Sequence, residues 1–227
     1  MKNPRYLVEQ ADIDYALNPT PWDLGNQVLY DMCAAHPQHT THQEAVSKLW
    51  LIGRSYAAAI ERRKNKKNES DEFYEETVGP KICRSDLDNL LSNLPTGPAD
   101  PVVSVTNAIR THKKVTELFN RLAKMEKRSL ASKYLHFHRP DIFFIYDNRA
   151  QTAINKLTPD CRCFDCINIP ENERDELYYK FCMRACWLIQ HIKDNFQQML
   201  TPRQIDKVLL KVHRRIRIRE PSLESDG

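Results

Sequence analysis

The stretch SKYLHFHRPDIFFIYDNRA, residues 132–150, brings a lysine, two histidines and two arginines close in sequence to Asp147. The apolar run IFFIY comes directly before this aspartate. Apolar surroundings raise the pKa of a carboxyl because they disfavour its charged form, whereas nearby arginines lower it. In either case the acidity of Asp147 is tuned by its setting, and tuned groups are common at active sites.

Lys133 and Asp147 are placed to converge although other residues separate them in sequence. The proline of the HRP tripeptide ends the helix that carries the lysine, so that helix and a short return segment join the two residues. Asp147 also suits the N-cap of a helix that begins at Asn148, where its side chain would accept backbone N–H groups. An interpretation without chemistry is this capping role, together with an ion pair to Arg149 or Arg139.

The elements that must position this pair are helical nearly throughout. Helix starts are indicated by Thr20-Pro21, by the capping-box spacing from Thr41 to Glu44 and by Thr201-Pro202. Periodic apolar residues then extend each pattern. The expected helices span 20–36, 41–62, 71–94, 102–127, 129–138, 148–157, 171–199 and a final stretch from 201.

The pattern predicts an all-α fold with a single globular domain over residues 1–213. The proline-rich segment LPTGPADP marks a possible sub-domain boundary near 95–101. Residues 214–227 are expected to form a flexible tail, first basic and then acidic. The run IFFIY alone has strand character, but periodicity does not separate a short strand from a buried connector. There is no nucleotide-binding glycine loop, and the chain has only 5 glycines.

Composition is that of a folded soluble protein, with 227 residues, 41% hydrophobic and 28% charged. No apolar stretch reaches the roughly 20 residues of a membrane helix, so no membrane partner is expected. The N-terminus lacks the apolar core of a secretory signal. We therefore expect a cytoplasmic protein.

Charge is distributed in clusters, although the net charge is only +4. Basic residues gather at 61–67, 110–114 and 211–219. Clusters of this kind favour nucleic acid as a partner, and DNA is the expected form. A solvated loop at 61–67 and a frayed tail after 211 are the alternatives that need no partner.

A lysine, an Arg-Pro pair, an apolar run and an aspartate follow one another at Lys133, Arg139-Pro140, 142–146 and Asp147. This order resembles the catalytic core of the helix-hairpin-helix DNA glycosylases, of the endonuclease III and 8-oxoguanine glycosylase type. The resemblance covers residues 115–157 in detail and the all-α layout more loosely. The segment KRSLASK lacks the hairpin glycine of that family, and the spacing from lysine to aspartate is shorter by about one helical turn.

The resemblance implies an enzyme that excises a damaged or modified base from DNA. Breaking an N-glycosidic bond builds positive charge on the sugar, which the Asp147 carboxylate would stabilise. Lys133, with its pKa lowered by burial or by Arg128 and Arg139, would attack the sugar carbon and form a Schiff base. Lys133 and Asp147 are thus the expected catalytic residues of a hydrolase, with no metal or cofactor.

The same resemblance implies residues that hold the DNA, because the target base must leave the stack. Tyr134 and Tyr146 are expected to stack against the extruded base, with core packing as the alternative. The expected DNA contacts are Arg128, His136, His138, Arg139, Asn148 and Arg149. For the histidines, a surface or internally bonded position is the alternative.

Seven cysteines in a chain without a secretory signal favour reduced thiols over disulfides. Cys182 and Cys186 are four residues apart on one helix, as a tetrahedral zinc site allows. An iron–sulfur cluster is the second option, because some helix-hairpin-helix glycosylases carry one. The spacing does not match that family pattern, so structural thiols are preferred. The cysteines concerned are Cys161, Cys163, Cys166, Cys182 and Cys186.

Two other functions compete with a base-excision glycosylase. One is a non-catalytic all-α module that binds nucleic acid through its basic clusters, with Asp147 only a helix cap. The other is a protein–protein adaptor with a solvating basic tail. A steep loss of affinity with salt separates these two, because phosphate contacts release counterions.

Overall fold

The computed structural model describes residues 6–64, 69–96, 101–159, 161 and 167–220, and its secondary structure in these ranges is helical. The expected all-α fold class is therefore confirmed. The expected boundary near 95–101 falls mainly on 97–100, which lie outside the described residues. The helices are α1 (Gln10–Leu17), α2 (Asp23–Ala35), α3 (His42–Ser55), α4 (Ser70–Phe73), α5 (Gly79–Cys83), α6 (Leu87–Ser92), α7 (Pro101–Ala123), α8 (Arg128–His138), α9 (Asn148–Leu157), α10 (Glu176–Phe196) and α11 (Pro202–Arg219).

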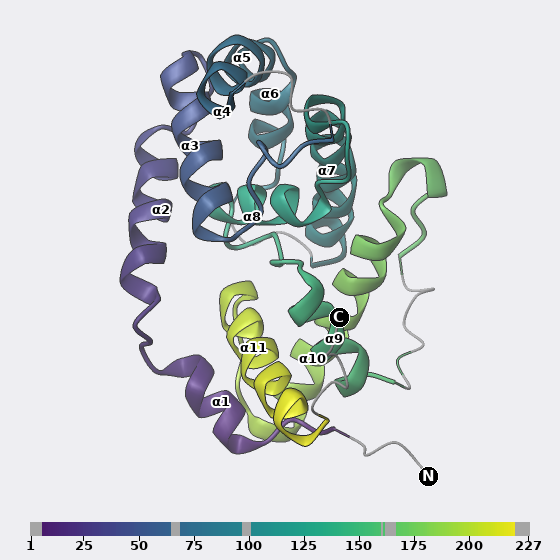
Figure 1. Cartoon of the computed structure of the whole chain (residues 1–227). Coiled ribbons are helices and arrows are strands. Elements are labelled where there is room, and N and C mark those ends of the chain that lie inside the picture. The colour runs from purple at the N-terminus through teal and green to yellow at the C-terminus, as the bar shows by residue number, and fades with distance from the viewer. Residues whose placement is uncertain (1–5, 65–68, 97–100, 160, 162–166, 221–227) are drawn as a thin grey trace.

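The helices form two groups, joined along one edge by α2 (Figure 1). Helices α3 to α8 lie in the upper group, and α1, α9, α10 and α11 lie in the lower group. Each group has its own core of buried apolar side chains. The long helix α7 serves both, because Ile109 belongs to the lower core and Val115 to the upper core.

The run IFFIY is the link between the two cores. It is neither helix nor strand in the structure, so its expected strand character is not realised. Ile142 and Phe143 are buried in the upper core, whereas Phe144 and Tyr146 are buried in the lower core. The run is apolar because the chain passes here from the upper core to the lower core, and almost every side chain along it is buried in one of them. Asp147 comes next and is thereby placed at the junction of the two groups.

The helix ends follow from capping residues. At α3, Thr41 and Glu44 form the expected capping box, and Thr201 with Gln204 does the same for α11. Helix α2 begins later than Thr20-Pro21 predicts, at Asp23. The Asp23 carboxylate accepts the Thr20 backbone N–H at 2.7 Å, so it satisfies a backbone donor of the segment that precedes the helix.

The last helix is longer than the sequence indicates. Residues 214–219, which we expected in the tail, are the final turns of α11. Ile216 is buried there, and Arg215 pairs with Glu9 and with the buried Asp12 at 2.6 and 3.0 Å. These contacts hold the end of the chain against α1. Residues 221–227 lie outside the described residues.

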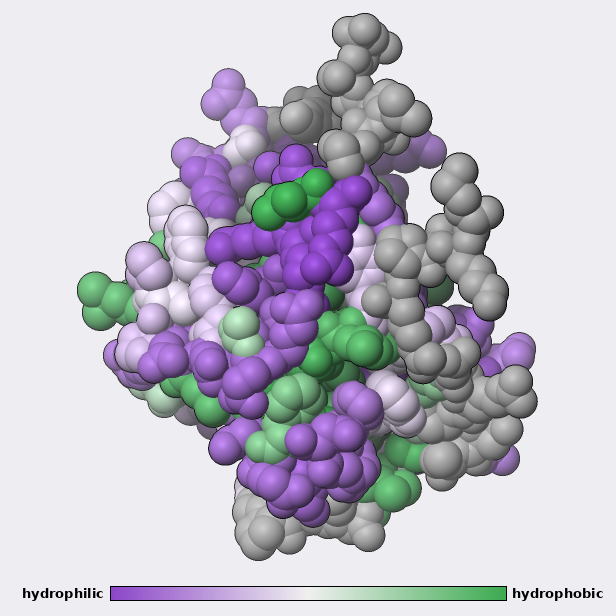
Figure 2. All heavy atoms as spheres, turned by 90° about the horizontal axis from the view of Figure 1, so that it is seen from below, coloured by the Kyte–Doolittle hydropathy of each residue, from purple (hydrophilic) through white to green (hydrophobic). Residues whose placement is uncertain are grey.

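The surface on the side of α1 and α11 is mostly hydrophilic, with hydrophobic side chains in small groups between (Figure 2). Across the described helices, none is long and apolar enough to cross a bilayer.

Candidate functional site

Lys133 and Asp147 meet at the junction between the two groups of helices. The lysine Nζ lies 3.4 Å from Asp147 Oδ2 and 2.7 Å from Ser129 Oγ. The other carboxylate oxygen, Oδ1, accepts the Ala150 backbone N–H at 3.0 Å, so Asp147 is the N-cap of α9. The lysine side chain is 2% exposed and the aspartate side chain 16%. Both the expected convergence and the expected cap are present.

Ser132 fixes the distance between this pair. Its hydroxyl accepts the Tyr146 N–H at 3.0 Å and lies 3.2 Å from the Tyr146 carbonyl oxygen, to which it can donate. Ser132 precedes Lys133 on α8, and Tyr146 precedes Asp147 on the linking segment. These bonds hold α8 and the linking segment together one residue before each partner. A buried serine in this position is therefore a positioning residue for both.

The surroundings disfavour the charged form of Lys133 and favour the charged form of Asp147. Burial lowers the pKa of Lys133, although the Asp147 carboxylate opposes this shift. Burial alone would raise the pKa of Asp147, but Lys133, the Ala150 N–H and Arg149 outweigh it and leave that pKa below its ordinary value. The carboxylate therefore stays ionised at neutral pH, and the lysine is held closer to its uncharged form than a surface lysine is.

A cavity of about 520 Å³ lies beside the pair, between α2, the end of α3 and α11. Its wall carries three aromatic side chains, Tyr15, Trp22 and Tyr56. It also carries four basic side chains, Arg149, Arg203, Lys207 and Arg214. This combination of aromatic faces and cations suits a ligand that is flat and has a phosphate attached.

Tyr56 and Arg149 separate the cavity from the Lys133–Asp147 pair. Both line the cavity. The Tyr56 ring centroid lies 5.8 Å from the lysine Nζ, and the Arg149 guanidinium lies 3.5 Å from Asp147 Oδ2. The Arg149 side chain is 59% exposed. The pair thus lies directly behind residues of the cavity wall, and the exposed Arg149 side chain is next to its carboxylate.

Tyr56 reaches this position through the turn that ends α3. The residue after it, Ala57, has φ 51°, in the left-handed region that costs a non-glycine residue free energy. The Ala58 N–H donates to the Gly53 carbonyl at 2.8 Å, which is the closing bond of a Schellman motif. The strained turn carries Tyr56 off the helix and places its ring between the cavity and Lys133.

Two of the expected DNA contacts are engaged within the protein. Arg128 pairs with Asp175 at 2.5 Å and with Glu126 at 2.7 Å. His136 is fully buried. Its Nδ1 donates to the Phe143 carbonyl, and its Nε2 accepts from a tyrosine hydroxyl of α2, each at 2.7 Å. Burial lowers the pKa of His136 to about 4, so this ring is neutral at pH 7.

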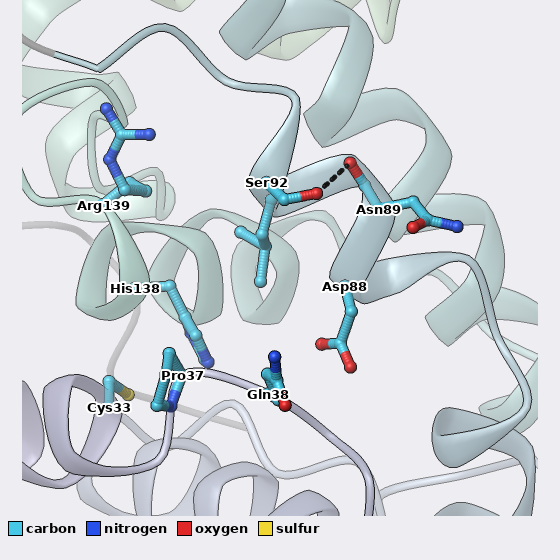
Figure 3. A pocket seen from close by; sticks show the side chains of 9 residues that line it. Cys33, Pro37, Gln38, Asp88, Asn89, Ser92, His138 and Arg139 are labelled. Atoms are coloured by element: carbon cyan, nitrogen blue, oxygen red, sulfur yellow. Dashed lines mark hydrogen bonds between the residues drawn. The ribbon is translucent and has the colours of Figure 1, made fainter.

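His138 and Arg139 lie at a different cavity, of about 380 Å³, formed with α2 and α6 (Figure 3). His138 Nδ1 donates to the Tyr134 carbonyl at 2.9 Å, and burial lowers the pKa of the ring to about 3. Arg139 donates to Asp141 at 2.9 Å and to the Pro95 carbonyl at 2.6 Å. The structure does not bring either residue to the Lys133–Asp147 pair.

The two tyrosines expected to stack on a base are core residues. Tyr134 is completely buried, and its hydroxyl is hydrogen-bonded to His39. Tyr146 is buried in the lower core, with its hydroxyl 2.7 Å from Gln151 Oε1. Of the remaining expected contacts, Asn148 is exposed on the first turn of α9, next to Arg149.

The cavity brings in residues that sequence reasoning missed. They are Tyr15, Trp22, Asn26, Tyr56, Arg203, Lys207 and Arg214. A signal for part of this set is present in the sequence, because Arg203, Lys207 and Arg214 recur at helical spacing on one face of α11. The cavity residues of α2 and α3 have no such signal in the sequence, because their place in the cavity depends on how the two groups of helices pack together.

The cysteines form no metal site within the described residues, where no group of three or more histidine, cysteine or acidic side chains is placed to hold an ion. Cys161 and Cys182 are buried and Cys186 is half-buried. Cys163 and Cys166 lie outside the described residues. Burial raises the pKa of Cys186 to about 12, so this thiol is protonated at neutral pH.

Comparison with known proteins does not place the chain in a family. No family model, no curated protein and no solved structure matches it.

Proposed function

We propose that the protein is a DNA glycosylase-like enzyme that excises a damaged or modified base. The observation that supports this most directly is the Lys133–Asp147 pair, whose charged atoms lie 3.4 Å apart beside a cavity lined by aromatic and basic side chains. The resemblance of residues 115–157 to the helix-hairpin-helix glycosylases points to the same chemistry. The volume of about 520 Å³ is in the range of ligand pockets and can admit an extruded nucleoside.

The chemistry assigns separate roles to the two residues. As the N-glycosidic bond breaks, positive charge develops on the sugar, and the ionised Asp147 stabilises it. Lys133 acts as a free amine. Its Nζ forms a bond to the sugar C1′ while the base leaves with the bonding electrons, and the amine proton passes to the departing base. Its buried position supports this role because burial lowers the pKa of the lysine.

DNA binding would itself uncover the carboxylate. Arg149 covers Asp147 from the solvent side at 3.5 Å, and its side chain is largely exposed. A phosphate of the bound strand can accept two parallel hydrogen bonds from the guanidinium, whereas the Asp147 carboxylate is already bonded to Lys133 and to the Ala150 N–H. The Arg149 side chain then moves to the DNA backbone, and the Asp147 carboxylate faces the sugar.

The test uses 25-base-pair duplexes, each carrying one damaged or modified base, with and without borohydride. We expect base release from at least one duplex and a covalent adduct trapped by borohydride. Lys133→Gln should abolish the adduct. The matched control is Lys81→Gln, the same change on an exposed lysine of α5, which should keep the adduct. No base release from any duplex in the panel would contradict the proposal.

A non-catalytic nucleic-acid-binding protein is the second candidate. The basic side chains of α11 and the exposed Trp22, which is 66% exposed, favour it independently of the Lys133–Asp147 pair. In that case DNA would bind with a steep salt dependence, and Lys133→Gln would leave affinity unchanged.

A further inference from the structure

We infer that the cavity selects its base through an edge with neighbouring hydrogen-bond acceptors, which Asn26 and Arg203 recognise by donating to it. This inference rests on the proposed function, because it takes the occupant of the cavity to be an extruded base. It goes beyond that function by naming the class of base. Guanine-type and cytosine-type bases fit, whereas adenine-type bases do not.

Asn26 has a buried donor that nothing in the described structure satisfies. The residue lines the cavity and is 7% exposed. Its Oδ1 accepts the Tyr56 hydroxyl proton at 2.7 Å, whereas its Nδ2 has no partner among the described residues. A buried N–H without an acceptor destabilises the fold, so natural proteins rarely leave one unpaired without a reason.

Tyr56 determines which end of the Asn26 amide is unpaired. Burial raises the pKa of the Tyr56 phenol well above its ordinary value, so the hydroxyl keeps its proton and acts as donor. In the structure this hydroxyl donates to Asn26 Oδ1, which leaves the NH₂ group for another partner. Asn26 is in this way fixed as a hydrogen-bond donor.

Arg203 offers a second unsatisfied donor on a residue that lines the same cavity. Two of its nitrogens are engaged by carboxylates, Nη1 by the buried Asp206 and Nη2 by Asp23 at 3.8 Å. Its Nε is buried and has no partner in the part of the chain that the structure describes. Asp23, which pairs with Arg203, lies one helical turn before Asn26 on α2. Asn26, Arg203 and Tyr56 all line the cavity, so both donors belong to the same end of it.

Two donors at one end of a cavity require two acceptors on the ligand. Guanine presents O6 and N7 side by side, both of them acceptors. Cytosine presents O2 and N3 in the same way. Adenine places its N6 amino donor beside N7 or N1, so one protein donor would face another. A site built from buried polar groups rejects such a mismatch strongly, because the groups would stay unpaired.

The test compares duplexes that carry one unpaired nucleotide, since an unpaired base leaves the stack at low cost. Binding is measured by fluorescence anisotropy at fixed salt for unpaired dG, dC or dA in one sequence context. We expect dG or dC to bind at least ten-fold more tightly than dA. Asn26→Asp replaces the donor by an acceptor of the same shape, so this preference should shrink or reverse. Arg203→Lys keeps the charge opposite Asp206 but removes Nε, and should also reduce the preference.

The matched control is Asn89→Asp, the same chemical change on a residue of the other cavity, which should leave the preference unchanged (Figure 3). Equal affinity for the three duplexes, or no binding, overturns the inference even if base release is observed. A preference for dG or dC without release of any base supports the recognition and contradicts the proposed chemistry. The two failures are therefore distinguishable.

Discussion

Asp147 is the N-cap of α9 and, in the proposed function, also stabilises the sugar cation, and a second aspartate allows these two roles to be separated. Asp175 is also an N-cap, of α10, and also pairs with an arginine, Arg128. It does not line the cavity described between α2 and α11. Asparagine is as good an N-cap as aspartate, so both caps survive a change to asparagine.

We predict that Asp147→Asn lowers base release by about 100-fold or more, because the charge that stabilises the sugar cation is lost. Asp175→Asn should leave the rate within a few-fold of the wild type. Single-turnover kinetics on the best duplex from the panel measure both. Equal effects of the two changes would mean that Asp147 acts only through the helix it caps.

Asp206 makes stability depend on pH. Burial raises the pKa of this carboxyl to about 6, although Arg203 opposes the shift. Because the folded-state pKa lies above the ordinary value of 3.8, the proton stabilises the folded state. This contribution is complete below about pH 4 and is lost as the pH rises through 6.

We predict that Asp206→Asn removes this dependence. Between pH 4 and 7 the unfolding free energy of the wild type should fall by about 3 kcal/mol relative to the variant, from the size of the pKa shift. Urea unfolding of both proteins across that pH range measures the difference. A difference that is independent of pH would show that the Asp206 carboxyl titrates normally.

At the residue level, the sequence predicted what depends on near neighbours. Asp147 as a cap and its approach to Lys133 follow from a proline, a helix and a short return segment. The fate of His136 did not follow, because its partner Tyr30 lies 106 residues away and burial arises from tertiary packing. Tyr134 and Tyr146 were expected to stack on a base because their burial also arises from tertiary packing, which the sequence does not show. An aromatic side chain has the same local pattern in a core as beside a ligand.

Helix α2 provides a test of the cavity at the scale of one element. Gly25 lines the cavity, and a Cβ added there would meet nothing within 4 Å. An alanine is accordingly accommodated without strain, whereas a phenylalanine occupies space that a ligand needs.

We predict that Gly25→Ala stabilises the protein by about 0.5–1 kcal/mol, the usual gain for alanine over glycine in a helix, and keeps DNA binding. Gly25→Phe should keep the fold but weaken binding to the unpaired-nucleotide duplexes at least ten-fold. Thermal unfolding and anisotropy measure the two effects. If Gly25→Phe binds as the wild type does, the ligand lies elsewhere.

Among the elements, the sequence predicted the helices that carry their own caps. Thr41 and Thr201 were identified as starts and are confirmed. The stretch 71–94 was predicted only as one or two helices. It contains a π-helical segment, Tyr74–Val78, between short α-helices, and this irregularity has no simple periodic signature. The length of α11 was missed because its last turns are held by α1, at the opposite end of the chain.

At the scale of the whole molecule, the basic side chains around the cavity should dominate affinity for DNA. Arg214 is exposed on α11 and lines the cavity, whereas Arg84 is exposed on the upper group at the end of α5. Replacing either by alanine removes the same charge from the chain.

We predict that Arg214→Ala reduces the slope of log affinity against log salt by about 0.9, the value for one lost phosphate contact on duplex DNA. Arg84→Ala should leave the slope unchanged. Anisotropy titrations at a series of salt concentrations give both slopes. Equal reductions would indicate a diffuse attraction to the net charge of the protein.

The two-core arrangement could not be predicted from the sequence. The composition and the helical patterns indicate one domain, and both cores draw on the same kinds of apolar residues. What divides them is the path of the chain, in particular the passage of residues 142–146 from one interior to the other. The cavity depends on how the two groups of helices are arranged, so only the part of its lining on α11 could be recognised in the sequence.

The pairing of α1 with α11 has a consequence for biosynthesis. Tyr6 and Glu220 are hydrogen-bonded across 214 positions, and Arg215 binds Glu9 and Asp12. The upper core draws its members from residues 29–143, so it can assemble while the ribosome is still translating the rest. Helix α1 is synthesised before α11, and its apolar side is covered only once α11 has formed. The cavity, which needs α11 as a wall, is thus completed later than the upper core.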